Sequence, residues 1–480
     1  MKRTLVFLCT ALLGIAFLTA CAQDGEAVPA ASDPLSGTGD LPAAPSALPF
    51  SVGTLYEPAW NTNSGTYGCT SGTAYYELVQ SSAFVDAADD QWEDWLILCT
   101  DYATRVQAPL CSVPGCAHTD TGCPAYLHTR SGQSTFYLGI INERLYVLHT
   151  YWREIEASHS ANEKPTVWLE AAALDGSGRT RLTELPPEWW LPGPLLLTDG
   201  AALYGQFADM TDSSIHGIRI DLESGDYTSF SFGLDGSEEL VGALDNRFLL
   251  SRANHTIAGL AYPEIIASTE RYSLVSGTAY ALLTNELVLL DPASGTRSSL
   301  RETLAPLAQD PSPYMWFYQQ QKYYFCTVIE NANGSTQKLW QCDLAKNECH
   351  ILAQRESGPE AGGWWSIQKL TLFPSDSGVE EPYIHGSYWD GDTNQGFLLD
   401  VRDGSIYPTA LYYRQAYYGT NPVIPLAQTE DGLWLVQTQE APIFWGGYRF
   451  YYALAAPETV FSGAGELYPI QMWMPETPLG

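Results

Sequence analysis

The sequence carries little positive charge. Lysines and arginines number 23 against 55 aspartates and glutamates, so the formal net charge is −32 at pH 7. A surface with this balance repels the phosphates of nucleic acids and the headgroups of anionic lipids. It also keeps a protein dispersed at a crowded surface, which requires no specific cation. We therefore expect no nucleic-acid partner.

Long helical patterns and local catalytic motifs are also missing. No stretch repeats apolar residues with a sustained period of 3.6, so long amphipathic helices are not expected. The sequence has no Gly-x-Ser-x-Gly elbow, no His-Glu-x-x-His pair and no Gly-x-x-x-x-Gly-Lys phosphate loop. These absences exclude the enzymes that such motifs identify, but not enzymes whose catalytic groups come from distant segments.

What the sequence does contain is a recurring hairpin. In residues 217–232, Ile218 and Ile220 alternate with Arg219, and Asp221 and Gly225 then supply the chemistry of a turn. The same pattern of an apolar residue, Asp, a turn and Gly recurs at 174–178, 290–295 and 399–404. Weaker copies stand at 342–347, where Asn347 replaces the glycine, at 99–101, and in degenerate form near 453–459.

The recurrence predicts the fold. A further apolar strand pair lies upstream of each hairpin, which gives four strands per unit of roughly 40–50 residues, the signature of a propeller blade. We expect an all-β chain that forms a β-propeller of about seven blades, with six or eight also possible, each of four antiparallel strands. The alternative is a β-sandwich or two stacked β domains, neither of which needs repeated units.

The N-terminus has the pattern of an export signal. Residues 1–20 begin with Lys2 and Arg3 and continue with an apolar run, and residues 18–21 match the bacterial lipobox. The resemblance to lipoprotein signals implies that Cys21 is lipidated; a plain secretory signal cut nearby is the alternative. Residues 21–49 are predicted to be a flexible tether, because they are rich in Ala, Pro, Ser and Gly. Residues 50–480 are the predicted propeller domain.

Three cysteines and a histidine cluster in a short loop. Cys111, Cys116, His118 and Cys123 can close a tetrahedral zinc site, although their spacing is not a common zinc-finger spacing. A disulfide between two of the three cysteines, or free thiols, are the alternatives, and we expect a structural role in each case. Cys342 and Cys349 lie on either side of the weak hairpin turn and are placed to form a disulfide across that hairpin.

These features together resemble a known group. A lipobox, a Cys-x4-Cys-x-His-x4-Cys loop after the first blade, and repeated Asp…Gly hairpins are similar to the uncharacterised β-propeller lipoproteins of Gram-positive anaerobic bacteria. The resemblance implies a propeller fold and a location in the cell envelope. It implies no assigned activity and no catalytic residues.

Aromatic residues recur in the segments that link blades and in the loops between second and third strands, which share one face of a propeller. The predicted ligand-binding residues are Trp189, Trp190, Trp364, Trp365, Trp389, Tyr412, Tyr413 and Trp445. Flat rings with polar neighbours can stack on sugars or on peptide side chains. The alternative is that these rings wedge between blades as part of the core.

The sequence therefore predicts a monomeric, extracytoplasmic protein that is lipid-anchored to the bacterial cell membrane. Its propeller is expected to bind a glycan, a peptide or an envelope protein through the aromatic-rich face, without catalysis. A hydrolase or lyase that acts on polysaccharide would instead require carboxylates that converge in the central funnel. A non-catalytic scaffolding protein would have a protein partner and no small-ligand pocket.

Overall fold

The computed structural model describes most of one compact unit, Ala44–Gly480, whereas the other unit, Met1–Ala43, lies outside the described residues. The described ranges are 47–58, 60–62, 68–80, 92–130, 134–151, 166–191, 195–209, 211, 214–232, 238–252, 286–300, 315–319, 322–331, 334–357, 365–374, 382–390, 393–415, 419–442 and 448–474. The predicted signal and Cys21 therefore fall outside the described residues.

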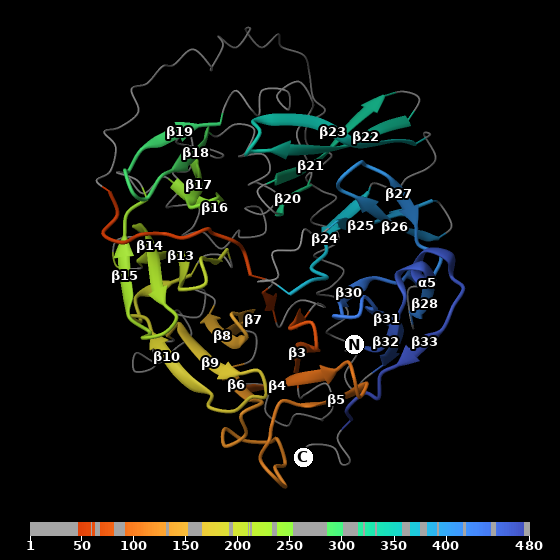
Figure 1. Ribbon diagram of the computed structural model, residues 1–480, viewed down its shortest axis with the longest axis horizontal. Coiled ribbons are helices and arrows are strands. Elements are labelled where there is room, and N and C mark those ends of the chain that lie inside the picture. The colour runs from red at the N-terminus through yellow and green to blue at the C-terminus, as the bar shows by residue number, and fades with distance from the viewer. Residues whose placement is uncertain are drawn as a thin grey trace, which may run out of the picture. The chain divides into compact units, whose positions relative to one another are not determined.

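Seven antiparallel sheets follow one another along the chain and stand around a central axis, with the last sheet beside the first (Figure 1). Within each sheet the four strands pair in sequence order, from an innermost to an outermost strand. We number the sheets as blades 1 to 7. The chain is a seven-bladed β-propeller, so the predicted fold is confirmed and the sandwich is excluded.

The strands of the first four blades have the following bounds. Blade 1 holds β2 (Cys69–Thr70), β3 (Ala74–Gln80), β4 (Trp92–Asp101) and an outer strand in two parts, β5 (Val106–Pro109) and β6 (Tyr126–Arg130). Blade 2 holds β7 (Ser134–Ile141), β8 (Arg144–Tyr151), β9 (Trp168–Ala173) and β10 (Thr180–Glu184). In blade 3, β11 (Trp189–Trp190) and β12 (Leu197–Thr198) both pair with β13 (Ala202–Asp209), followed by β14 (Ile215–Asp221) and β15 (Tyr227–Phe230). Blade 4 holds β16 (Glu238–Leu244), β17 (Arg247–Arg252), β18 (Glu286–Leu290) and β19 (Arg297–Ser299).

The remaining blades continue the same order. Blade 5 holds β20 (Met315–Gln319), β21 (Lys322–Asn331), β22 (Gly334–Asp343) and β23 (Glu348–Ser357). Blade 6 holds β24 (Ser366–Lys369), β25 (Tyr383–Trp389), β26 (Asn394–Asp400) and β27 (Ile406–Pro408), and a hairpin of β28 (Tyr412–Gln415) and β29 (Gly419–Pro422) follows it. Blade 7 holds β30 (Pro425–Gln428), β31 (Trp434–Pro442), β32 (Tyr448–Ala455) and β33 (Leu467–Pro469).

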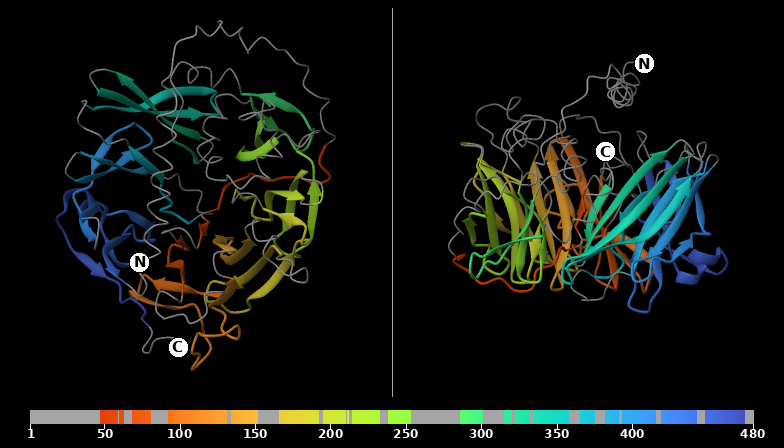
Figure 2. Two further views of the ribbon diagram at one scale, coloured as in Figure 1. Left: turned by 180° about the vertical axis from the view of Figure 1, so that it is seen from behind. Right: turned by 90° about the horizontal axis from the view of Figure 1, so that it is seen from above.

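The connections alternate between two sides of the ring, because each blade is an antiparallel meander (Figure 2). One side carries the links between second and third strands and the links between blades; we call it the loop face. The opposite side carries the links between first and second and between third and fourth strands; we call it the turn face. The predicted Asp…Gly turns join third to fourth strands and so lie on the turn face.

These turns form as their residues predict. In blade 3 the carboxylate of Asp221 accepts hydrogen bonds from the backbone N–H groups of Glu223 (3.1 Å) and Ser224 (3.0 Å). Gly225 then adopts a φ of 79°, which is accessible to glycine without a steric penalty. The equivalent turns begin at Asp291 in blade 4 and Asp400 in blade 6, with Gly295 and Gly404 at positive φ.

The weaker copies differ in instructive ways. Asn347 in blade 5 and Arg105 in blade 1 occupy the glycine position with φ angles of 58° and 57°. The degenerate last copy is no turn at all, because α5 (Pro457–Ser462) fills the link between β32 and β33 and ends at Gly463, which has a φ of 68°. No helix among the described residues has the length and apolarity that a membrane crossing requires.

The hydrophobic core consists of layers between neighbouring blades. One buried cluster joins Tyr324 and Leu339 of blade 5 to Ile384 and Phe397 of blade 6. Burying one such side chain contributes roughly 1.5–3 kcal/mol, so each layer holds its two blades together.

The segment before blade 1 crosses the turn face. The Leu48 N–H donates to the Pro292 carbonyl of blade 4 at 2.8 Å, and Tyr56 then exchanges two backbone hydrogen bonds with Thr198 of blade 3. The segment ends as β1 (Asn61–Thr62), which pairs with the innermost strand of blade 2, β7 (Figure 1). It therefore ties blades 4, 3 and 2 together before the first blade begins.

Candidate metal centre and aromatic face

The cysteine-rich loop interrupts the outer strand of blade 1. β5 ends at Pro109 and β6 begins at Tyr126, and both strands pair with β4. The loop leaves and returns at one point: the Leu110 N–H donates to the Ile97 carbonyl and the Ile97 N–H donates to the Ala125 carbonyl, each at 2.9 Å. Because the blade stays paired on both sides of the insert, the loop can adopt a shape of its own.

Within the loop the four predicted ligands meet. The ligand atoms of Cys111, Cys116, His118 and Cys123 all lie within 4.8 Å of one another. Nδ1 of His118 is 3.3 Å from Sγ of Cys123, and the His118 N–H donates to Sγ of Cys116 at 3.4 Å. Positive φ angles at Gly115 (70°) and His118 (60°) turn the chain sharply enough to bring these side chains together.

The chemistry of this cluster suits a metal ion. Burial, together with the neighbouring Cys111 and Cys116 thiols, raises the pKa of the Cys123 thiol to about 12, while burial lowers the pKa of His118. A divalent cation would favour thiolates here, since the metal ligand is the deprotonated sulfur. Three thiolates and one imidazole fill all four positions of a tetrahedral structural site. The cluster could therefore hold a metal ion, with no position left for a substrate.

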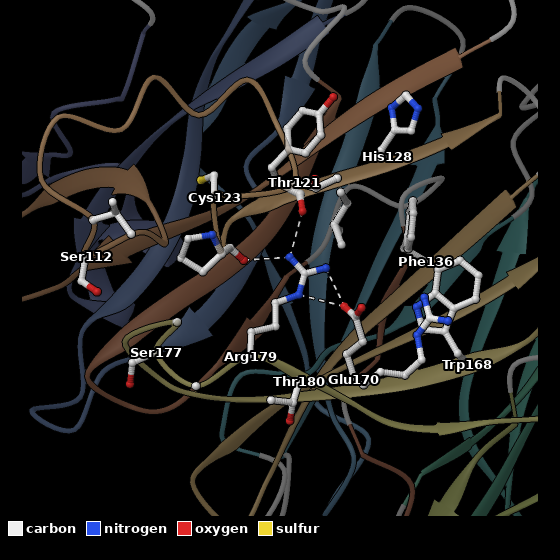
Figure 3. Close-up of a pocket in the computed structure, with 18 residues that line it drawn as sticks. Ser112, Thr121, Cys123, His128, Phe136, Trp168, Glu170, Ser177, Arg179 and Thr180 are labelled. Atoms are coloured by element: carbon white, nitrogen blue, oxygen red, sulfur yellow. Dashed lines mark hydrogen bonds and ion pairs between the residues drawn. The ribbon is translucent and has the colours of Figure 1, made fainter.

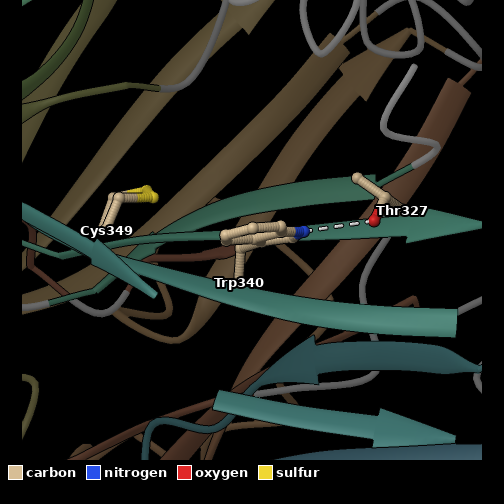
Figure 4. The surroundings of a disulfide bond; sticks show 4 residues. Thr327, Trp340 and Cys349 are labelled. Atoms are coloured by element: carbon tan, nitrogen blue, oxygen red, sulfur yellow. Dashed lines mark hydrogen bonds between the residues drawn. A yellow bond between two sulfur atoms is a disulfide. The ribbon is translucent and has the colours of Figure 1, made fainter. Parts of the chain in front are cut away.

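The cysteines follow two different chemistries. Cys342 and Cys349 face each other across β22 and β23 and form a disulfide beside Trp340 (Figure 4). Cys111, Cys116 and Cys123, in contrast, form no disulfide in the structure, and neither do Cys69, Cys99 and Cys326. The predicted alternative of a disulfide within the loop is thus not formed.

Arg179 connects the cysteine-rich loop to blade 2, a contact that no sequence signal indicated. Its Nη1 donates to the carbonyls of Pro124 and Tyr126, both at 2.8 Å, and its Nε and Nη2 donate to Oε2 of Glu170 at 2.8 and 2.5 Å (Figure 3). A cavity of about 780 Å³ lies here, between the loop and β6 on one side and β9 and β10 on the other. The loop is therefore docked between two blades.

Three of the eight predicted ligand-binding aromatics are buried and a fourth, Trp189, is half-buried against the core. Trp190 and Trp365 are each 2% exposed and Tyr413 is 7% exposed, so these three belong to the core layers. Trp189 is half-buried and stacks on Phe207, with ring centroids 4.0 Å apart. These side chains wedge between blades, which is the alternative that the sequence left open. Trp364 and Trp445 lie outside the described residues.

Trp389 is exposed, and Tyr412 is half-buried. Trp389 ends β25 at the start of the β25–β26 loop, on the loop face, and is 47% exposed. The next residue, Asp390, accepts a hydrogen bond from Nε2 of Gln395 at 2.8 Å, and Oε1 of Gln395 accepts the hydroxyl hydrogen of Tyr412 at 3.1 Å. The residue that follows Trp389 is thus linked to Tyr412 through Gln395.

An arginine near Trp389 was not predicted. The guanidinium of Arg355, from the outer strand β23 of blade 5, lies 3.7 Å from the ring centroid of Tyr388 in blade 6. Arg355 and Tyr388 are 33 positions apart, and no local pattern reveals such a contact. The loop face therefore presents, at the junction of blades 5 and 6, a stacked cation and an exposed indole.

Comparisons with known proteins find no family and only distantly similar solved structures. No protein-family model and no curated protein matches the chain. Among solved structures, an oligogalacturonate lyase in complex with manganese is 11% identical with a TM-score of 0.40 over 86% of this chain and 100% of that chain. The β-propeller domain of the Trilobed protease from Pyrococcus furiosus is 8% identical with a TM-score of 0.40, over 88% and 97% of the two chains. The GH74 xyloglucanase from Xanthomonas campestris is 11% identical with a TM-score of 0.36, over 80% and 55%.

Proposed function

We propose that this chain is an extracytoplasmic, lipid-anchored propeller that binds a glycan on its loop face. The observation that carries the proposal is the accessibility of Trp389, which is 47% exposed where Trp190, Trp365 and Trp434 are each 2% exposed. A large apolar ring left in water at the edge of a loop is free to stack on a ligand, and a sugar offers such a ring an apolar C–H face.

The groups beside Trp389 favour a sugar over an apolar peptide. The Thr393 N–H donates to Oδ1 of Asp390 at 2.8 Å, and Gln395 donates to both Asp390 and Thr393. These contacts hold the side chains of Asp390, Thr393 and Gln395 in place before any ligand arrives, which lowers the entropy lost on binding. The loop thus combines a flat apolar surface with fixed hydroxyl, amide and carboxylate groups that can bond sugar hydroxyls.

The test is binding of the purified extracytoplasmic chain to an array of bacterial and plant glycans, followed by titration of the best ligand. Trp389→Ala should bind at least about tenfold more weakly, because stacking and burial of one indole face contribute roughly 1.5 kcal/mol or more. Tyr407→Ala removes another exposed ring of blade 6, on the outer strand β27 (40% exposed), and should bind as the wild type does.

Three outcomes would contradict the glycan proposal. The first is equal binding by wild type and Trp389→Ala. The second is a wild-type protein that binds peptides or one envelope protein but no glycan, which would support a scaffolding role. The third is turnover of a bound polysaccharide, which would make the protein an enzyme.

The lipid anchor is proposed from the lipobox and is tested separately. Wild-type chain expressed in a bacterial host should partition with the membrane and carry acyl chains on an N-terminal Cys21, as seen by mass spectrometry of the N-terminal peptide. Cys21→Ser should appear in the aqueous fraction. A wild-type chain cut near Cys21 but free of lipid would show a plain secretory signal instead.

We further propose that the ion held by Cys111, Cys116, His118 and Cys123 is a structural zinc. The support is the convergence of four ligand atoms from a closed Cys₃His set within 4.8 Å. Metal analysis of protein purified without chelator should give about one zinc per chain. Cys116→Ser should lose it, whereas Cys326→Ser, which changes a buried cysteine of blade 5 outside the loop, should retain it. A second disulfide in the non-reduced wild type would contradict the proposal.

A further inference from the structure

One junction of the ring has no covalent link. Consecutive blades are joined by the chain itself, but blade 7 and blade 1 are the two ends of the ring. All four strands of blade 7 lie between Pro425 and Pro469, and the first strand of blade 1 begins at Cys69. Among the described residues, no strand that precedes blade 1 pairs with blade 7. This closing junction is therefore held by noncovalent contacts, which include the Glu430 N–H bond to the Gly72 carbonyl (3.0 Å), buried side chains and the segment after β33.

Part of the contact between blade 7 and blade 1 is buried. A core layer joins Tyr75 and Tyr102 of blade 1 to Tyr452 and Leu454 of blade 7. Within it the carboxylate of Glu77, 9% exposed, accepts the hydroxyl hydrogen of Tyr452 at 2.7 Å. The two partners are 375 positions apart, so the contact exists only when the ring is closed.

The outer edge is closed by the segment that follows β33. Gln471 forms a parallel bridge with Val106: its N–H donates to the Arg105 carbonyl at 2.8 Å, and its carbonyl accepts the Gln107 N–H at 2.9 Å. The segment thus passes from the outer strand of blade 7 onto the outer strand of blade 1, just before the cysteine-rich loop.

Two residues later the segment reaches the metal ligands. The ring of Trp473 meets that of His118 edge to face, with centroids 6.5 Å apart and an interplanar angle of 84°. Trp473 also packs against the core cluster that contains Cys123, with Cys111 and Cys116 at its border. The ligand loop therefore supplies part of the surface that receives Trp473.

We propose that metal binding at the Cys₃His loop locks the closing junction, with Trp473 as the residue that transmits the effect. The inference rests on the proposed zinc site. An ion fixes the positions of Cys111, Cys116, His118 and Cys123, and so fixes the surface on which Trp473 packs. A docked Trp473 in turn holds Gln471 on the edge of blade 1. By thermodynamic linkage, the free energy by which the bound ion stabilises the closed junction equals the free energy by which closure strengthens ion binding.

The experiment measures zinc affinity by chelator competition in the wild type and three variants of the full chain. Trp473→Ala should bind zinc about threefold to tenfold more weakly, the effect of losing one aromatic contact. Trp473→Phe keeps a ring edge near His118 and should recover most of the affinity. Trp389→Ala removes the same side chain from blade 6 and should leave zinc affinity unchanged.

A second readout is thermal unfolding with and without chelator. Chelation should lower the Tm of the wild type and of Trp389→Ala by the same amount, and should lower that of Trp473→Ala by clearly less. Equal zinc affinities and equal chelator shifts in wild type and Trp473→Ala would overturn the lock while leaving the zinc site standing. A wild type that binds no zinc would overturn the zinc proposal itself.

Discussion

The closing junction and the other junctions of the ring are built differently. Where the chain runs on from blade to blade, small residues let the blades approach: a Cβ on Gly225 would lie 2.1 Å from the Leu182 carbonyl oxygen, and one on Gly404 would lie 2.1 Å from that of Leu352. In blade 1 the same turn position holds Arg105. Its guanidinium lies 5.9 Å from the ring centroid of Tyr468 in blade 7.

The hydrogen bonds at the closing junction also differ in kind from those between consecutive blades. Blades 3 and 4 are joined by bonds from the Leu240 N–H to Oε1 of Gln206 (2.7 Å) and from Nη2 of Arg297 to the Phe232 carbonyl. Blades 5 and 6 are joined by bonds from the Trp365 N–H to Oε1 of Gln337 (2.9 Å) and from Nε2 of Gln341 to the Val401 carbonyl (3.0 Å). The closing junction instead has the buried carboxylate of Glu77, which accepts hydrogen bonds from both blades, and the outer bridge at Gln471. The two junctions between consecutive blades thus combine close packing with separate bonds between side chains and backbone, whereas the closing junction centres on a shared buried carboxylate.

The largest effect is expected when the polar network of the closing junction is broken. Glu77 accepts hydrogen bonds from Nε2 of Gln107 (2.6 Å) and from the hydroxyl of Tyr452. Glu77→Ala should lower the free energy of unfolding by about 3–5 kcal/mol, because it leaves two buried donors without their acceptor. Tyr452→Phe removes one bond and should cost about 1 kcal/mol. Urea denaturation measures both, and a Glu77→Ala protein as stable as the wild type would contradict this assignment.

A junction between consecutive blades should be sensitive to an increase in side-chain volume where the blades approach closely. Gly225→Ala should destabilise by about 2–4 kcal/mol, the sum of left-handed strain and of the displacement of the Leu182 backbone. Gly178→Ala is the matched control, since Gly178 also has a positive φ (64°) but no atom within 4 Å of the added Cβ. It should cost only the strain, about 1–2 kcal/mol. Equal losses in the two variants would show that the close approach between blades 2 and 3 contributes nothing.

The smallest effect concerns the turn carboxylates, which are common to ordinary blades. Hydrogen bonds from the side chain of Arg402, and then from its backbone N–H, hold the pKa of Asp400 below its usual value. The resulting stabilisation is complete above the unfolded pKa of about 3.9 and is lost as the pH falls through the lower folded value. Between about pH 4 and pH 2, Asp400→Asn should therefore show a shallower loss of stability, by at most about 1.4 kcal/mol per pH unit.

A second variant tests whether Asp400 causes this acid sensitivity. Arg402→Ala removes the main partner of Asp400 and should flatten the acid limb to a similar degree. Unfolding measured in urea at several pH values decides the point. A slope in Asp400→Asn as steep as that of the wild type would mean that other groups set the acid sensitivity.

Features that depend on a few neighbouring residues were predictable from the sequence. The turn at Asp221 and Gly225 forms because a short carboxylate and a glycine four residues later act locally. The convergence of Cys111, Cys116, His118 and Cys123 was foreseeable because thirteen residues cannot carry them far apart. The number of blades followed from counting such local units.

Features that depend on the closed ring were not predictable. The contact of Tyr452 with Glu77 and that of Trp473 with His118 join residues from opposite ends of the domain, and no spacing signals them. The burial of Trp190 and Trp365 was missed for a related reason. A short segment between blades has no sustained period, so the sequence does not show whether its rings point into the core or toward solvent.

Hydrogen exchange tests the central claim most directly, because it reports on both kinds of junction at once. Zinc-loaded and chelated protein should differ in the exchange of the Gln107 and Gln471 amides at the closing junction. The Leu240 and Trp365 amides, at ordinary junctions, should exchange at the same rate in both samples. Faster exchange after chelation at Gln107 and Gln471 alone is the predicted result. Equal acceleration at all four amides, or none at Gln471, would contradict a ring whose one unlinked junction is locked by the metal loop.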